Sequence, residues 1–311
     1  MRVKLLVLLV LSVLGCSSSD SDGLTTDGLT GSDADPGAAD AAPGETTPDG
    51  VPIVVPTTCV EYTVRHLQAS MQHTDALADI RTSIDKAFAN PDGVAPDTIS
   101  WTEIESQAQI DRIQGKAGWD TYWPKLPDAP LVRAANAVPI SWRTDVFDFV
   151  SGSSVKASDG KAGVSPDRFV TRVRLRHKPS GTEVMRIAHH AVAGIDSLTD
   201  NVAYRIETHA KDVTAFNARM LDSTLPVIGS GDFNTTTLRA KLKAENGGTQ
   251  PYVYDVPASG GSHGSRLIDY IVRRQDDGNI YELTDVRFVN LAPSDHRGVR
   301  ATYDYRPAPC E

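Results

Sequence analysis

The sequence predicts an α/β protein built from two packed β-sheets with helices on their outer faces. Segments with strand character outnumber helical segments, and the helical segments lie between strands. In residues 169–176, apolar side chains alternate with mostly basic ones, which is the period of a strand. In residues 200–221, Val202, Ile206 and Val213 fall near one face of a helix. A simple doubly wound sheet is disfavoured, because its strands and helices would alternate regularly.

The other elements follow from the same patterns. An amphipathic helix is expected at 75–89, and Lys178–Gly181 predicts a turn between the strand at 169–176 and a strand at 183–192. A second, short helix is expected at 238–244. The remaining strands are predicted at 60–66, 98–103, 225–229, 267–272, 281–289 and 299–305.

The N-terminal segment has the pattern of an export signal. Arg2 and Lys4 precede a short apolar run that ends near Leu14 and is followed by Leu-Gly-Cys16. This motif resembles the lipobox of bacterial lipoproteins, which implies a signal peptide of residues 1–15 and a diacylglyceryl anchor on Cys16. We expect an exported protein, lipid-anchored to a bacterial membrane at the cell surface or the periplasmic face. The alternative is an ordinary signal peptide that contains a cysteine.

The next segment, from Cys16 to residue 56, is expected to be a disordered acidic tether. It is rich in small and polar residues, and it carries eight acids and no Lys or Arg. The domain at 57–311 then holds 32 of the 40 acids and 29 of the 31 bases, a net charge of about −3. Such a balance excludes a global basic field for holding polyanions, so nucleic acid would need a local patch.

Two cysteines remain near the ends of the folded segment, Cys59 and Cys310. Outside the cytosol, they are expected to form a disulfide that joins the first and last strands. The alternative is a pair of free buried thiols.

Acids, amides and imidazoles follow or interrupt several of the predicted strands. Taken singly, a strand-end acid is more often a turn or capping residue than a ligand, and a histidine can be an ordinary core residue. Asp269 is a stronger signal, because a carboxylate inside an apolar run needs a cation or an imidazole as its partner. The side chains that follow or interrupt strands in this way are Glu103, His189, His190, Asp232, Asn234, Asp269, Asp295 and His296.

The motifs around these residues, in this order, resemble the endonuclease/exonuclease/phosphatase superfamily, which includes enzymes similar to deoxyribonuclease I. They read Trp-Thr-Glu103, Ala-His-His190, Gly-Asp-Phe-Asn234, Ile-Asp-Tyr270 and Ser-Asp-His296. The resemblance spans 60–305 and implies a four-layer α/β/β/α sandwich of two mostly antiparallel sheets. It also implies phosphoester hydrolysis that depends on Mg²⁺, with Mn²⁺ or another divalent cation as the alternative.

The resemblance assigns five catalytic residues. Asp232 and Asn234 are expected to orient the attacking water and contact phosphate, and His296 is expected to offset developing charge on the phosphate. Asp269 would fix the tautomer of this imidazole and raise its pKa. His190 is the second histidine expected to contact the phosphate, and His189 is the weaker candidate for that role.

The metal is expected at Glu103, with Asp295 beside it. One departure concerns the first strand, where the family has an asparagine that supports the metal site. In this sequence His66 or Gln68 stands there, and His66 is taken as the substitute that contacts the metal or a carboxylate.

The predicted function is that of an exported, monomeric phosphodiesterase similar to endonucleases, which touches the membrane only through its lipid. Arg172, Arg174 and Arg176 are candidate contacts to nucleic acid, or else a solvated strand face. A sphingomyelinase-like enzyme would instead use Trp119–Pro124 as an aromatic loop, unless these are simply packed aromatics. The motifs are also consistent with a small-molecule phosphatase. The absence of the family's asparagine from the first strand is consistent with a degenerate, non-catalytic surface binding module.

Overall fold

The computed structural model describes residues 60–72, 76–89, 93–123 and 138–307. The chain divides into two units, Met1–Glu45 and Thr46–Glu311, and all described residues lie in the second. The predicted signal peptide, the tether, Cys16 and the Cys59–Cys310 pair therefore lie outside the described residues. Among the helices described, none has the length and apolar character to cross a membrane.

The first sheet has six strands in the order β11-β12-β1-β2-β4-β3. Its strands are β1 (Tyr62–Ser70), β2 (Thr98–Thr102), β3 (Trp119–Tyr122), β4 (Ile140–Arg143), β11 (Tyr281–Asn290) and β12 (Arg297–Tyr305). β1 and β2 run parallel, and the other neighbours are antiparallel. The N-terminal and C-terminal strands of the described fold thus lie side by side, with Tyr62 opposite Tyr305.

The second sheet also has six strands, in the order β5-β6-β7-β8-β10-β9. Its strands are β5 (Phe147–Ser158), β6 (Arg168–His177), β7 (Glu183–His190), β8 (Val227–Asp232), β9 (Tyr252–Tyr254) and β10 (Asp269–Arg274). Only β7 and β8 run parallel. Each sheet therefore contains one parallel pair, with the rest antiparallel.

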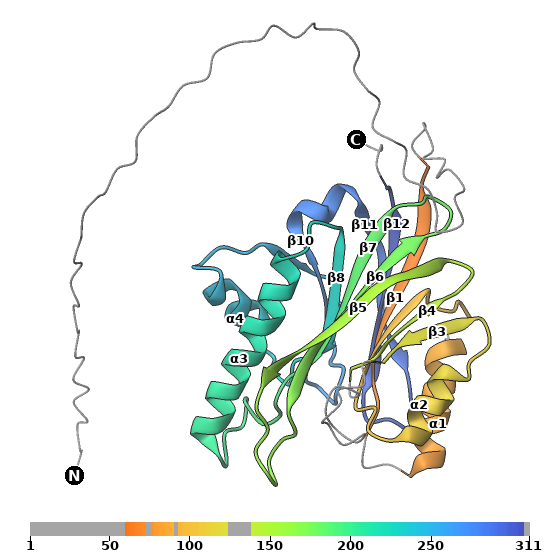
Figure 1. Cartoon of the computed structure of the whole chain (residues 1–311). Helices are drawn as coiled ribbons and strands as arrows, with labels where there is room; N and C mark the ends of the chain where they lie inside the picture. Colours follow the sequence, from red (N-terminus) through yellow and green to blue (C-terminus); the bar gives the residue numbers. More distant parts are fainter. Residues whose placement is uncertain (1–59, 73–75, 90–92, 124–137, 308–311) are drawn as a thin grey trace, which may run out of the picture. The chain divides into compact units, whose positions relative to one another are not determined.

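Helices cover the outer face of each sheet (Figure 1). α1 (Leu77–Ala89) and α2 (Gln107–Gln114) pack on the first sheet, and α3 (Val202–Leu221) and α4 (Leu238–Glu245) pack on the second. A short 3₁₀ helix, η2 (Gln275–Asn279), follows β10. Side chains from both sheets form a third, central core that includes Val173, Ile228 and Val299. These layers are the four-layer α/β/β/α sandwich that the sequence predicts.

Local chemistry explains why the predicted elements form. α1 buries Ile80, Ile84 and Phe88, which recur at helical spacing. α2 begins with a capping box in which the Ser106 side chain accepts a hydrogen bond from the Gln109 backbone, and the Gln109 side chain accepts one from the cap backbone in return.

The stretch Val227–Asp232 needs its glycines for close packing. A Cβ on Gly231 would lie 2.0 Å from the carbonyl oxygen of His189 in the neighbouring strand. A Cβ on Gly229 would meet the side chains of Met220 and Phe216 in α3. The glycines therefore bring β8 against β7 and α3, and they fix the edge at which Asp232 emerges.

The structure differs from the sequence prediction in several elements. β3, β4, β5, β9 and α2 were not among the predicted segments, and β8 continues beyond the predicted end at residue 229 to Asp232. Trp119–Tyr122 forms a strand, and Trp119 packs edge-on against Phe88 at a centroid distance of 4.9 Å. These packed aromatics match an ordinary core segment and not an exposed loop.

Candidate active site

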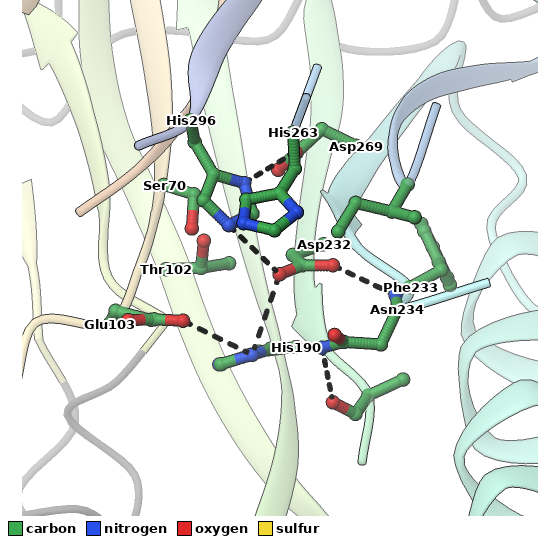
Figure 2. A network of polar contacts seen from close by, with 12 residues as sticks. Ser70, Thr102, Glu103, His190, Asp232, Phe233, Asn234, His263, Asp269 and His296 are labelled. Carbon is green, nitrogen blue, oxygen red and sulfur yellow. Dashed lines mark hydrogen bonds and ion pairs between the residues drawn. The ribbon is translucent and has the colours of Figure 1, made fainter. Parts of the chain in front are cut away.

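The predicted polar residues converge at one edge of the sandwich, where the two parallel strand pairs end. Glu103 follows β2, while His190 and Asp232 are the last residues of β7 and β8. Asp269 and His296 arrive at the same edge from the beginnings of antiparallel strands, and Asp269 lies directly opposite Asp232 in the ladder. Figure 2 shows these side chains pointing toward one another from both sheets.

His296 and Asp269 form a buried pair. The imidazole Nδ1 lies 2.7 Å from Asp269 Oδ2, so the carboxylate accepts a hydrogen bond from Nδ1–H and leaves Nε2 facing the site. Burial by itself lowers the pKa of His296, but the Asp269 carboxylate, together with Asp232 and Glu103, raises it to about 10. The imidazole is therefore cationic at neutral pH.

Asp232 lies at the centre of the group and is almost fully buried. Its Oδ2 is 3.7 Å from His190 Nε2 and 4.0 Å from His296 Nε2 (Figure 2). Burial raises the pKa of Asp232 well above its ordinary value, the Asp269 carboxylate raises it further, and His296 opposes the shift. His190 also lies 3.9 Å from Glu103 Oε1, so one imidazole spans both carboxylates.

Two residues of the site have left-handed backbone conformations. Glu103 has φ of 61° and Asn234 has φ of 52°, which non-glycine residues rarely adopt. The Asn234 backbone donates to Asp232 Oδ1 at 2.8 Å, and its side-chain amide donates to the carbonyl oxygen of Ala191 at 3.1 Å. The tight turn thus compensates for its strain with two hydrogen bonds that fix the amide beside the carboxylate.

His66 does not reach this group. Its ring lies between the sheets, fully buried, 2.8 Å from the hydroxyl of Thr98 and 2.8 Å from that of Ser230. β1 continues to Ser70, so the predicted strand end at residue 66 is in fact the middle of the strand. Gln68, two residues further along β1, contacts the site, with Nε2 3.5 Å from Asp269 Oδ1 and 3.4 Å from the Thr102 hydroxyl.

His189 points away from the site, as expected for the weaker of the two neighbouring histidines. Its Nδ1 lies 2.9 Å from the carbonyl oxygen of Phe169, and its ring packs near Phe216 and Phe233 below α3. Successive side chains of a strand point to opposite faces, so His190 alone faces the site.

The site also contains residues that were not predicted, among them His263 and Arg168. His263 lies in the turn that precedes β10, with Nε2 3.1 Å from Asp295 Oδ2. Arg168, at the beginning of β6, is mostly buried, and its Nε donates to the Ser165 hydroxyl at 3.0 Å. The sequence signal for Arg168 was its place just before the alternating strand, whereas His263 lies in a segment without any periodic pattern.

The donor atoms fit a divalent cation. Ligand atoms of Glu103, Asp232 and His296 lie within 4.8 Å of one another in the described part of the chain. Carboxylate oxygens suit Mg²⁺ or Mn²⁺, and a cation would relieve the cost of holding the buried Asp232 in its charged form. Asp295, predicted beside the metal, lines the same cavity as Glu103, and its ligand atom lies within 4.8 Å of those of His263 and His296.

A cavity of about 590 Å³ opens above these groups. Its wall includes the site carboxylates and imidazoles as well as three basic side chains, Lys161, Arg168 and Arg266. This volume is typical of a pocket for a small ligand or for one portion of a longer one.

Comparisons with solved structures identify the fold. An endonuclease/exonuclease/phosphatase family protein from Bacteroides thetaiotaomicron matches with a TM-score of 0.58 and 14% sequence identity, over 82% of this chain and 99% of the other. A mannosyl-6-phosphatase from the same organism matches at 0.56 and 15%, over 76% and 98%. TDP2 from D. rerio, complexed with a single-strand DNA product, matches at 0.60 and 12%, over 78% and 98%.

No protein-family model and no curated protein sequence matches this chain. The fold is nevertheless that of the endonuclease/exonuclease/phosphatase proteins, as the motifs implied.

Proposed function

We propose that this protein is a metal-dependent phosphoester hydrolase, of the phosphodiesterase type that includes endonucleases. The observation that carries the proposal is the convergence of Asp232, His190 and the His296–Asp269 pair, with Glu103, at one sheet edge below a cavity. The solved structures of the same fold include a phosphatase and a protein bound to a DNA product, which supports phosphoester chemistry in general.

Each side chain has a role that its surroundings suit. Asp232, which lies at the centre of the group, accepts a proton from the attacking water. Asn234 holds that carboxylate in place through its backbone N–H. The cationic His296 donates a hydrogen bond to the phosphate, where negative charge develops, and Asp269 keeps its Nε2 directed at the reacting group.

Glu103, with the Asp232 carboxylate within reach, would hold the divalent cation, Mg²⁺ or Mn²⁺. Such a cation supplies neutralisation of phosphate charge and a lowered pKa for a bound water. His190, which faces both Glu103 and Asp232, is placed to contact a phosphate oxygen beside them.

The substrate proposed first is a phosphodiester, and nucleic acid is its leading example. Support comes from Lys161, Arg168 and Arg266 in the cavity wall. The Arg172–Arg176 row contributes less, because Arg172 lies 2.9 Å from Asp222 and Arg176 lies 2.9 Å from Glu183. A small-molecule phosphatase is the second candidate, favoured by a cavity volume that accommodates a small ligand. The packed Trp119 gives no support to a sphingomyelinase-like lipid enzyme.

We also propose that the enzyme is exported and held at a bacterial membrane by a lipid on Cys16. Arg2, Lys4 and the apolar run before Leu-Gly-Cys support this location. The catalytic domain is proposed to act as a monomer.

The test is hydrolysis of DNA, RNA, a synthetic phosphodiester, a synthetic phosphomonoester and sphingomyelin, each with Mg²⁺, with Mn²⁺ and with a chelator. We expect metal-stimulated cleavage of a phosphodiester by the wild type and loss of it in Asp232→Ala and His296→Ala. Asp276→Ala, which removes an exposed carboxylate in η2, is the matched control and should retain activity. If the wild type hydrolyses none of the substrates, the proposal that the protein is a phosphoester hydrolase is refuted. If all variants hydrolyse a substrate equally, the assignment of the active-site residues is refuted.

A further inference from the structure

Arg266 lines the cavity above the candidate site, and its backbone is held firmly there. It lies in the turn before β10, where its N–H donates to the His263 carbonyl oxygen and its own carbonyl oxygen accepts from the His263 N–H, each at 3.0 Å. The Arg297 N–H donates to the carbonyl oxygen of Ser262 at 2.7 Å, which joins the same turn to the beginning of β12. The base of the Arg266 side chain is therefore fixed relative to the site.

The guanidinium of Arg266 is held on one side only. One terminal nitrogen, Nη2, donates to Asp196 Oδ2 at 3.2 Å and to the carbonyl oxygen of Asn234 at 3.4 Å. Within the described part of the chain, no acceptor bonds its Nε or its other terminal nitrogen, Nη1. The side chain is 41% exposed, so these remaining N–H donors are available to a ligand in the cavity.

Asp196 fixes the orientation of this guanidinium. It lies in the segment between β7 and α3, and its carboxylate also accepts from the Thr235 hydroxyl at 2.8 Å and the Thr236 backbone N–H at 2.9 Å. Partial burial opposes ionisation, but these hydrogen bonds and the one from Arg266 lower the pKa of Asp196. Because Thr235 and Thr236 directly follow Asn234, one anionic carboxylate joins Arg266 to the turn that holds this amide.

Arg266 lies beside the reacting groups without belonging to them. The same Asn234 backbone that accepts from Arg266 donates through its N–H to Asp232 Oδ1 at 2.8 Å. The backbone of a single residue thus connects the guanidinium to the carboxylate proposed to act on the attacking water. The cavity that both residues line is about 590 Å³, a size that suits a whole small ligand and not a phosphate alone.

We propose that Arg266 and Asp196 form a subsite for a second phosphate group, next to the one that is hydrolysed. Arg266 is the contacting residue, because a guanidinium held through one nitrogen presents its other N–H groups as a preorganised fork for phosphate oxygens. Asp196 is a positioning residue. That the bound anion is a phosphate rests on the proposed function. The subsite narrows the substrate class to molecules with two or more phosphates, as in a nucleic acid chain or a small bisphosphate.

The test compares two pairs of ligands that differ by one phosphate: TpTpT with the dinucleotide TpT, and glycerol bisphosphate with glycerol phosphate. Affinities are measured by calorimetry in Mg²⁺ on the full-length chain carrying Asp232→Asn, in which the proposed function predicts that turnover is lost. We expect the additional phosphate to raise the affinity by about tenfold in one of the pairs, since hydrogen bonds to charged groups contribute that much. The pair that shows this gain identifies the source of the second phosphate.

The variants are made in the same Asp232→Asn chain. Arg266→Ala should abolish the gain and leave the affinity for the ligand with fewer phosphates nearly unchanged, whereas Arg266→Lys should restore part of it. Asp196→Asn should reduce the gain by about threefold, because the amide still accepts from Thr236 but forms no ion pair with Arg266. Arg81→Ala is the matched control, because it removes the same charge from an exposed position of α1 outside the cavity wall, and it should keep the full gain.

The outcomes separate the subsite from the proposed function. A gain that depends on Arg266 supports the subsite even if the wild type hydrolyses none of the substrates. No gain in either pair, or an equal gain in Arg266→Ala and Arg81→Ala, overturns the subsite even if the wild type is an active hydrolase. If Asp196→Asn weakens both members of a pair equally, Asp196 only stabilises the fold and its positioning role is overturned.

Discussion

Acid should destabilise this protein through His177, which is buried at the end of β6. The ring is 2% exposed, lies 2.8 Å from the Ser180 hydroxyl, and packs among Tyr62, Phe147 and Tyr305. Burial, and then the nearby charge of Arg186, lowers the pKa of His177 from 6.5 to about 4. The folded state therefore keeps the imidazole neutral over a range in which the unfolded state protonates it.

The sign and the size of the effect follow from this difference. Above pH 6.5 the imidazole is neutral in both states and contributes no pH dependence. As the pH falls, protonation stabilises the unfolded chain alone. The free energy of unfolding then drops by about 2 kcal/mol at about pH 5 and about 3 kcal/mol at about pH 4, below which both states are protonated and the loss levels off.

The assay is urea denaturation at about pH 7.5 and about pH 5. His177→Phe is the informative variant, because phenylalanine fills a similar volume among the aromatic rings and does not titrate. We expect the wild type to lose about 2 kcal/mol more than His177→Phe between these pH values, whatever their difference at the higher pH. Parallel losses in the two proteins would show that the imidazole is not held neutral, and the reasoning would fail.

Three further outcomes are expected. Asp269→Asn should lower kcat for phosphoester hydrolysis by on the order of a hundredfold or more with little change in KM, because an amide cannot hold the imidazole charged. An unchanged kcat in steady-state kinetics would contradict this. His66→Ala should lower the free energy of unfolding by about 3 kcal/mol, since two buried hydroxyls lose their partner, and a loss below about 1 kcal/mol in urea denaturation would contradict this. Mass spectrometry of the exported protein should find a lipid on Cys16 and a bond between Cys59 and Cys310, and an unmodified Cys16 or free thiols would refute the respective claim.

The convergence of the candidate site residues was predictable because each follows a strand with clear periodicity or belongs to a short motif. The apolar lead-in of β8 marks where Asp232 emerges, and the carboxyl ends of parallel strands meet at one edge. Asp269 was identifiable for another reason, since a carboxylate in an apolar run needs a partner, which proves to be His296.

Elements whose sequences show no regular alternation of apolar and polar residues were not predicted. β5 is an edge strand, and most of its residues are at least partly exposed, including a Ser-Gly-Ser-Ser run with low strand propensity. Its pairing with β6, rather than its own composition, makes it a strand. His263 belongs to a turn whose position depends on backbone bonds to Arg266 and β12, which no local pattern encodes.

The misplaced His66 shows how a strand boundary changes the chemistry that is inferred. When β1 is ended at residue 66, an imidazole is expected at the edge where the candidate site lies. Because β1 continues to Ser70, the same imidazole lies within the sandwich, and Gln68 stands near Asp269 instead. Side chains two residues apart on a strand point to the same face of the sheet but lie at different distances from the strand end. Only the register of the strands in three dimensions therefore distinguishes a ligand at the edge from a hydrogen-bonding group in the core.

The charge state of a histidine in this fold depends on its nearest charged neighbour as well as on burial. His66 and His177 both lie near Arg186, a fully buried guanidinium that bonds Tyr281 and the Met185 carbonyl and forms no ion pair with any described carboxylate. Burial and this positive charge lower the pKa of both imidazoles. His296 is almost as buried, yet three carboxylates raise its pKa to about 10. Replacing Arg186 with methionine should therefore raise the pKa of His177, measurable by NMR titration, and leave that of His296 unchanged; equal shifts at both would refute a local origin.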